Sequence, residues 1–553
     1  MSFLWREESE ESNYKYMPIF SLNNRTIQST ANQSLFDLAK ELSMPIPSSC
    51  KEQGKCKECL IEIKEGSEFL SPLTKEEQHL LPQYRLACQT FIEKEGEVKV
   101  ENLKRSLIKI EDKGVATISN LKLEPAVYKK RTTVFLDDEA IGETTGSLLG
   151  LAVDIGTTTV VVRLIDLEEG KIKATASFEN PQRFAGSNVM ARIVYDTEYG
   201  KKELKRVFTA HLSNTILSFC DTPSTIFEVM IGGNTTMRDL FFGLNVFTIG
   251  QTPYKSLTEF DVEKGKKETT AIENNAKKMQ LPIHPKARIY GLPIIGGHVG
   301  ADTSAGLLAI QLMQEDKIIA FMDIGTNTEM VIGNKHKAIT ASSPSGPAFE
   351  GGGIAYGMPA LDGAIENVKL SDAGSIAIKT VNNKPPVGIC GSGLIDILGE
   401  LTRTEKINQT GRFVDDIELL YLDNNKQVFI NENDINLLSQ TKAANVAALQ
   451  ILFKEYGIAF DEIDTFYLAG GFGEHIDIEA GIRIGLLPNI SREKFKKIGN
   501  ATIEGLTIAL LSKTKRTALE KFVKNIQQVN LESDPDFFDY FVEGCLFHEI
   551  EKR

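Results

Sequence analysis

Four cysteines near the N-terminus have the spacing of an iron–sulfur site. Cys50, Cys56, Cys59 and Cys88 follow the pattern C-x5-C-x2-C-x28-C, which puts three thiols on one loop and brings the fourth from a distant segment. Thiolates arranged in this way bind a [2Fe–2S] cluster, and Gly54 frees the loop so that backbone N–H groups can point at sulfur. A zinc site more often has two C-x-x-C pairs, and only one is present. We expect a cluster, with zinc as the alternative.

Two other stretches have residue types suited to phosphate chemistry. In residues 151–162 and 321–332 an apolar strand ends in Asp154 or Asp323, and a turn with Gly156 or Gly325 and several hydroxyls leads into a second apolar strand. Glycine lets the backbone approach a ligand, while hydroxyls and N–H groups suit phosphate and a hydrated cation. One such hairpin could lack a ligand altogether. Two copies predict two related lobes.

A third turn, in residues 466–475, runs from an apolar strand through Gly470, Gly471 and Gly473 toward a helix. It offers a flat backbone surface for the base and ribose of a nucleotide. Further glycine-rich stretches cover residues 231–237, which include Asn234, and residues 344–353 and 389–396. The last two are expected to line the nucleotide site, to form a moving lid, or to be plain strand-to-helix turns. Cys390 has no base assigned by the sequence and is expected to be structural.

The chain of 553 residues is long enough for three or four structural units. We expect an N-terminal extension (1–16), a cluster domain (17–103), a linker or small connector (104–149) and a large domain (150–553) with lobes at about 150–320 and 321–553. The connector could be a partly ordered tether or a rigid spacer. In the cluster domain we expect strands at 19–22, 26–28, 60–64 and 98–100, a helix opening at Ser34, and a short helix with a capping box of Thr74 and Glu77. Residues 531–553 should form a docked helix.

Composition narrows the choice of partners. A net charge of −13 argues against nucleic acid, which needs clustered Lys and Arg. The acidic N-terminal run is unlike a signal peptide, and no run of 18 apolar residues occurs, so we expect a cytoplasmic protein without a membrane segment.

Residues 17–103 resemble the plant- and vertebrate-type [2Fe–2S] ferredoxins, which implies a β-grasp fold. The first gap of five residues follows the vertebrate-type variant. The order DIGTTT, DIGTNTE, LAGGFG resembles the phosphate-1, phosphate-2 and adenosine segments of the actin, sugar kinase and heat-shock chaperone ATPases, and GNATIEG at 499–505 is similar to their second connecting segment. This resemblance implies a multidomain α/β protein whose two-lobed actin-like ATPase domain clamps ATP and Mg²⁺.

The same resemblance implies roles for individual residues. Asp154 and Asp323 would hold magnesium through its waters. Hydroxyls of the two turns would contact phosphate oxygens, and the remaining turn residues would surround the nucleotide. The residues expected at the nucleotide are Gly156, Thr157, Thr158, Thr159, Asn234, Gly325, Thr326, Asn327, Thr328, Gly470, Gly471 and Gly473. His298 and Asp302, in the stretch GGHVGAD before the second turn, are candidates for orienting the attacking water.

The whole layout resembles the ATP-dependent reductive activators of corrinoid-dependent methyltransferases. That family implies transfer of one electron from the [2Fe–2S] cluster to inactive Co(II) of a corrinoid protein, driven by ATP hydrolysis, with an upstream electron donor and a possible homodimer. The alternative is a redox-gated ATPase of kinase or chaperone-like type in which the cluster is a sensor. A second cluster near the C-terminus is not expected, because only Cys545 lies beyond Cys390.

Overall fold

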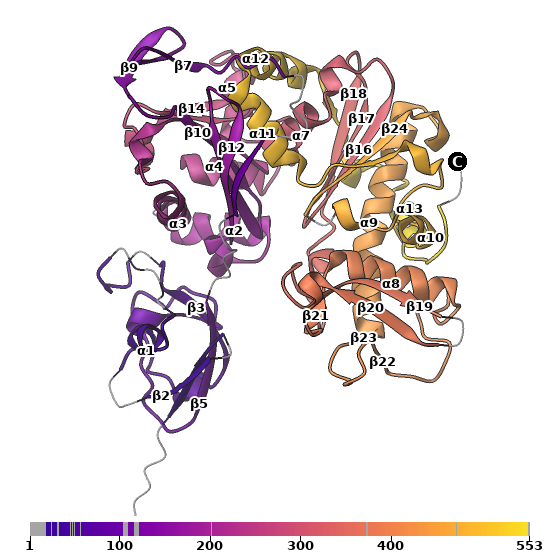
Figure 1. The fold of residues 1–553 in the computed structure, drawn as a ribbon. Coiled ribbons are helices and arrows are strands. Elements are labelled where there is room, and N and C mark those ends of the chain that lie inside the picture. The colour runs from indigo at the N-terminus through magenta and orange to yellow at the C-terminus, as the bar shows by residue number, and fades with distance from the viewer. Residues whose placement is uncertain are drawn as a thin grey trace, which may run out of the picture. The chain divides into compact units, whose positions relative to one another are not determined.

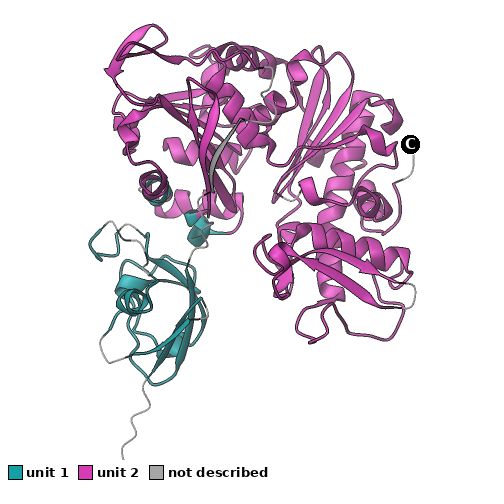
Figure 2. Ribbon diagram, viewed as in Figure 1, with its two compact units in different colours: residues 1–105, 181–186, 206–212 teal, residues 106–180, 187–205, 213–553 magenta. Residues whose placement is uncertain are grey.

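The computed structural model describes the chain in ranges: 18–23, 25–29, 33–44, 46, 48, 50–55, 57–102, 109–114 (backbone only), 121–200, 202–371, 374–471 and 473–550. The predicted N-terminal extension and Cys56 lie outside these residues. The chain forms two compact units (Figure 2). Unit 1 comprises residues 1–105, 181–186 and 206–212, and unit 2 comprises residues 106–180, 187–205 and 213–553.

Unit 1 is built on a mixed sheet with the strand order β2-β1-β5-β3-β4, in which β1 and β5 are parallel. Its elements are β1 (Ile19–Leu22), β2 (Arg25–Gln28), α1 (Leu35–Glu41), β3 (Leu60–Glu65), β4 (Tyr84–Leu86) and β5 (Glu97–Asn102). Ser34 caps α1 by accepting a hydrogen bond from Asp37 N, as the sequence predicts. Buried and exposed side chains alternate along the strands, and Phe20, Leu22 and Val98 are among the buried ones.

The predicted short helix at Thr74 is wrong, because residues 75–79 form only turns. The predicted capping contact is nevertheless present, since both N and Oγ1 of Thr74 donate to Glu77 at 2.9 Å. Glu77 is fully buried and also accepts from Arg85 Nε at 3.0 Å and from Leu86 N at 2.8 Å. These bonds tie the turn to β4 instead of letting a helix continue.

Unit 2 contains two sheets whose central strands have the same order. Strands β15-β13-β10-β11-β12 of the first correspond to β25-β24-β16-β17-β18 of the second, and β14, β6 and β26 extend the edges. The first sheet comprises β6 (Lys109–Gly114), β10 (Leu149–Ile155), β11 (Thr159–Asp166), β12 (Lys171–Glu179), β13 (Ile226–Gly233), β14 (Ile272–Asn275) and β15 (Arg288–Gly291). The second comprises β16 (Ile319–Ile324), β17 (Thr328–Gly333), β18 (Ala338–Ser343), β24 (Thr465–Ala469), β25 (Phe495–Lys497) and β26 (Gln527–Gln528). The shared order confirms two related lobes.

Two helices pack between the sheets (Figure 1): α7 (Ala301–Ala309) and α11 (Ala501–Leu511). They approach so closely that a Cβ on Gly505 would lie 1.8 Å from the backbone oxygen of Ala305. One buried apolar cluster contains Ala152 of the first sheet and Phe321 of the second together with residues of both helices. The lobes therefore share a core at this crossing.

Part of the predicted connector forms strands within unit 2. Strands β7 (Val127–Lys130), β8 (Thr133–Leu136) and β9 (Glu139–Glu143) make a small antiparallel sheet, and β6 pairs with β12. Asp137, at the tip between β8 and β9, accepts from Arg288 Nη1 at 2.5 Å and pairs with Lys513 at 2.6 Å. These ion pairs fasten residues 127–143 to the first lobe.

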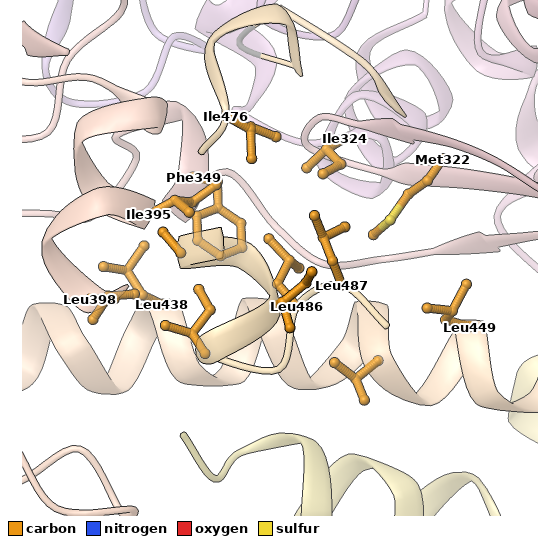
Figure 3. Packing of buried hydrophobic residues seen from close by; sticks show 14 of the residues in the cluster. Met322, Ile324, Phe349, Ile395, Leu398, Leu438, Leu449, Ile476, Leu486 and Leu487 are labelled. Carbon is orange, nitrogen blue, oxygen red and sulfur yellow. The ribbon is translucent and has the colours of Figure 1, made fainter. Parts of the chain in front are cut away.

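The second lobe has additional elements outside its six-stranded sheet. They are β19 (Ala364–Leu370), β20 (Ile376–Thr380), β21 (Gly388–Ile389), α8 (Gly391–Arg403), β22 (Leu419–Tyr421), β23 (Phe429–Asn431), α9 (Glu432–Tyr456), α10 (Ile478–Arg483) and α13 (Phe537–Gly544). Phe349, Ile395, Leu398 and Leu438 meet in its core (Figure 3). The C-terminal helix α13 packs on α9, and Lys442 of α9 donates to the backbone oxygens of Gly544 and Leu546.

The remaining helices in the described ranges are α2 (Val189–Tyr199), α3 (Glu203–Phe219), α4 (Thr235–Phe242), α5 (Leu257–Glu263), α6 (Ala276–Met279) and α12 (Lys513–Phe522). None of the helices in the described ranges combines the length and the apolar character that a bilayer span requires.

Candidate nucleotide and cluster sites

The two aspartates of the phosphate turns hold equivalent positions in the two lobes. Asp154 is the penultimate residue of β10 and lies opposite Gly232 of β13, and Asp323 is the penultimate residue of β16 and lies opposite Ala469 of β24. In each case the neighbouring parallel strand ends in a glycine-rich turn directly after the paired residue. The stretch at 231–237 is thus the first-lobe counterpart of the stretch at 466–475.

Half-buried carboxylates gather around these strand ends. Burial raises the pKa of Asp154 to about 7, although a hydrogen bond of 2.8 Å from Asn500 Nδ2 to Oδ2 favours its charged form. Burial raises the pKa of Asp302 to about 6, with a hydrogen bond of 2.8 Å from Thr303 N opposing the shift. Burial and the negative charges of Asp302, Asp154 and Glu350 raise the pKa of Asp323 to about 8.

Glu329 joins the same group of acids, because burial and the charges of Asp302 and Asp323 raise its pKa well above the ordinary range. So many mutually repelling carboxylates are most stable when a cation neutralises them. Among the described residues, no three acidic, His or Cys side chains are close enough to bind a metal ion directly. The group fits Mg²⁺ that keeps several of its waters, which is the usual form in phosphate sites.

The hydroxyls of the two phosphate turns meet. Thr158 Oγ1 lies 3.4 Å from Thr326 Oγ1, although the two residues belong to different lobes. Both hydroxyls donate to Oε2 of Glu350, Thr326 at 2.5 Å and Thr158 at 3.2 Å. Burial raises the pKa of Glu350, while these two bonds favour its carboxylate form. The two hydroxyls that would bind a bridging phosphate therefore bind the carboxylate of Glu350 in this structure.

Other contacts fix the first turn. Asn234 Nδ2 donates to Thr157 Oγ1 at 3.0 Å, while Asn234 Oδ1 caps α4 through Met237 N. Asn180 Nδ2 donates to Gly156 O at 2.8 Å, and Arg192 Nη2 donates to Thr157 O at 2.7 Å. Hydrogen bonds to the backbone oxygens of Gly156 and Thr157 therefore fix the conformation of the first turn.

The rest of the predicted nucleotide residues have varied surroundings. Thr328 is buried, and its Oγ1 lies 3.1 Å from Ser345 Oγ, whereas Thr159 is exposed at the start of β11. His298 is exposed, and its ring contacts that of Tyr254 at 5.3 Å. Unlike Asp302, His298 is not among the groups whose charge raises the pKa of Asp323.

The third turn, which the sequence predicts to face a nucleoside, brings glycine backbone close to the end of β16. Gly470 has a φ of +110° and donates to Gly499 O at 3.0 Å, and a Cβ on it would clash with Ile324 O at 2.2 Å. Gly471 faces open space. Asn500, which follows Gly499, caps α11 through Ile503 N and thereby connects this surface to Asp154.

The cysteines that the sequence predicts to bind the cluster lie in unit 1. Cys59 Sγ is 3.3 Å from Cys88 Sγ, close to the roughly 3.8 Å that separates two sulfurs bound at about 2.3 Å to one tetrahedral metal. The contact with Cys59 lowers the pKa of Cys88 to about 7, with help from Gln89 and from the backbone N–H of Gly54. Cys50 lies on the same loop as Gly54, whose φ is +70°. The donor set fits a [2Fe–2S] cluster.

Comparison with known proteins identifies a cluster-binding domain and an ASKHA domain. A model of the 2Fe-2S iron-sulfur cluster binding domain matches residues 21–93, the RACo middle region matches 149–315, and the C-terminal ASKHA domain of RACo matches 317–553. The structure of a reductive activator for corrinoid, iron-sulfur protein matches 97% of this chain and 99% of its own, with a TM-score of 0.71 and 27% identity. The chain belongs to the RACo family.

Two curated relatives extend this assignment to proteins with named activities. The corrinoid activation enzyme RamQ of Eubacterium limosum is 28% identical over 96% of this chain and 98% of its own length. The [Co(II) methylated amine-specific corrinoid protein] reductase of Methanosarcina barkeri is 25% identical over 68% of this chain and 73% of its own. The matches thus cover both the ferredoxin part and the actin-like ATPase part that the sequence predicts.

Sequence reasoning missed three residues of the nucleotide site: Glu329, Glu350 and Asn500. Glu329 directly follows the second hydroxyl turn, Glu350 is the lone acid of a glycine-rich stretch, and Asn500 is part of the stretch GNATIEG. The available signal was a polar side chain inside a motif assigned only to backbone roles.

Proposed function

We propose that this chain reactivates a corrinoid protein by reducing inactive Co(II) to Co(I) at the expense of ATP. The observation that carries the proposal is the match to a reductive activator over 97% of the chain. This match includes both the segment with the cysteine pair of unit 1 and the segments with the carboxylates of unit 2. When bound, the [2Fe–2S] cluster supplies one electron. Cys50, Cys59 and Cys88, together with Cys56, would hold it.

ATP is needed because Co(I) is a strong reductant. Each roughly 59 mV by which a one-electron step runs uphill costs about 1.4 kcal/mol. Residues of the protein cannot create this energy by position alone. Binding of ATP must favour a complex in which cobalt is easier to reduce, and hydrolysis must reset that complex.

We assign the roles in the nucleotide site as follows. Asp154 and Asp323 hold Mg²⁺ through water, and Thr158 and Thr326 donate to phosphate oxygens from opposite lobes. Support comes from their equivalent register and from the contact between the two hydroxyls. Asp302 orients the attacking water, because it lies among the interacting carboxylates at the start of α7. His298 is the less favoured candidate for this role.

The test is an anaerobic reaction containing reduced protein, MgATP and a Co(II)-corrinoid protein, followed by visible spectroscopy. The expected result is the Co(I) spectrum, together with ATPase activity that rises with the corrinoid protein. Omission of ATP should leave Co(II) unchanged. ADP formation without Co(I) would instead support the cluster as a sensor.

Two further parts of the proposal concern assembly and electron supply. We expect a homodimer, which light scattering after size exclusion tests. We also expect an external one-electron donor, because the cluster is oxidised when it gives its electron to cobalt and has to be reduced again before the next turnover. Stoichiometric reduction that stops after one equivalent without a donor would support this.

A further inference from the structure

Glu350 lies where the two phosphate turns meet. Its Oε2 accepts both hydroxyl protons, from Thr158 and from Thr326, and its Oε1 lies only 3.6 Å from the position of a Cβ on Gly325. The carboxylate therefore covers the backbone of the second turn and bridges the two lobes.

The segment that carries Glu350 is firmly held along the second turn. Gly346 N donates to Thr326 O at 2.9 Å, and Ser345 Oγ lies 3.1 Å from Thr328 Oγ1. Next to Glu350, Phe349 is 1% exposed in the core of the second lobe (Figure 3). The backbone is thus anchored, and the side chain of Glu350 is the part that can turn away.

A threonine hydroxyl has one proton to donate. If Thr158 and Thr326 donate to a phosphate oxygen, neither can donate to Glu350 at the same time. A phosphate oxygen that accepts both hydroxyl protons therefore replaces Oε2 as their acceptor. The carboxylate of Glu350 and the phosphate would also repel each other at this distance. The nearby carboxylate of Asp323, whose pKa the charge of Glu350 already raises, adds to the repulsion.

We propose that Glu350 is an internal substitute for a phosphate oxygen: in the nucleotide-free protein it occupies the position between Thr158 and Thr326, and a phosphate group of the nucleotide displaces it. This inference rests on the proposed nucleotide site. Glu350 thereby makes the protein select for a phosphate chain long and charged enough to compete, and it lowers the affinity for every nucleotide that has to displace it.

The test compares Glu350→Gln with the wild type and with Glu366→Gln, a half-buried glutamate on β19 that pairs with Lys379. Calorimetric titration of the full-length, cluster-loaded protein uses a non-hydrolysable MgATP analogue, MgADP, AMP and adenosine. Removing the charge of Glu350 should tighten binding of the ATP analogue at least tenfold and leave adenosine within twofold. Glu366→Gln should change neither, and the first nucleotide in the series to respond identifies the displacing phosphate.

Unchanged or weaker binding of the ATP analogue to Glu350→Gln would overturn the proposal and make Glu350 a ligand of the cation or of water. Glu350→Asp, which keeps the charge but withdraws it from the hydroxyls, should give a smaller gain and covers the case in which the glutamine variant does not fold. Cobalt reduction by the wild type is measured in parallel. A wild type that binds the ATP analogue but forms no Co(I) would refute the proposed function alone, whereas one that binds no nucleotide refutes both.

Discussion

Replacement of Asp154 by asparagine should stabilise the nucleotide-free protein, and the gain should grow with pH. Asp154 has a pKa of about 7 in the folded protein against an ordinary value of 3.8. Because the folded state holds this proton more tightly, its contribution to stability is greatest below pH 4 and is lost as pH rises through 7. A difference of about 3 pKa units corresponds to about 4 kcal/mol. About 3 kcal/mol of that change falls between pH 5 and pH 8.5.

The measurement is urea unfolding followed by far-ultraviolet circular dichroism in EDTA at pH 5 and pH 8.5. The transition that MgADP shifts in the wild type reports on unit 2. Asp154→Asn should move it to higher urea at pH 8.5 much more than at pH 5 and should abolish the shift by MgADP. Asp461→Asn, at an exposed carboxylate, is the control. Equal pH dependence in Asp154→Asn and wild type would refute the burial argument.

Three further changes test other contacts. Cys59→Ser should remove the visible absorption of the cluster and cobalt reduction while nucleotide binding persists, and Cys220→Ser should retain all three; cobalt reduction at the normal rate without Cys59 would contradict the electron path. Gly505→Ala should lower the free energy of unfolding by about 1–3 kcal/mol through overpacking at the helix crossing, whereas Gly146→Ala, which has room for a methyl group, should be neutral in the same urea titration. Asn500→Ala should weaken MgADP about tenfold at pH 7 and less at pH 9, because Asp154 loses a bond that favours its charge; an equal loss at both pH values in calorimetry would contradict this.

The phosphate turns were predictable because a local pattern specifies them. An apolar strand, Asp-Ile-Gly-Thr and a second apolar strand leave few other conformations, and the structure shows β10–β11 and β16–β17 at these places. Asp302 could be proposed only through resemblance, but its side chain does lie among the acids. What local patterns capture well is the geometry of single hairpins.

Contacts across the lobes were not predictable in this way. Glu350 meets Thr158 across 192 positions of sequence, and Asn500 meets Asp154 across 346. No periodicity reports such distances. The helix expected after Thr74 does not form for a related reason, since the carboxylate of Glu77 accepts hydrogen bonds from Arg85 and Leu86 in β4. Tertiary partners decided both outcomes.

Helix α9 gives the nucleotide site a mechanical connection to the far side of the second lobe. With 25 residues it is roughly 38 Å long. Near its first turn Asp434 accepts from Ala355 N, five residues beyond Glu350, and near its last turn Lys454 pairs with Asp534 and Asp536 just before α13. Because α9 is attached at both ends in this way, a tilt of the helix on nucleotide binding would also move the segment that precedes α13.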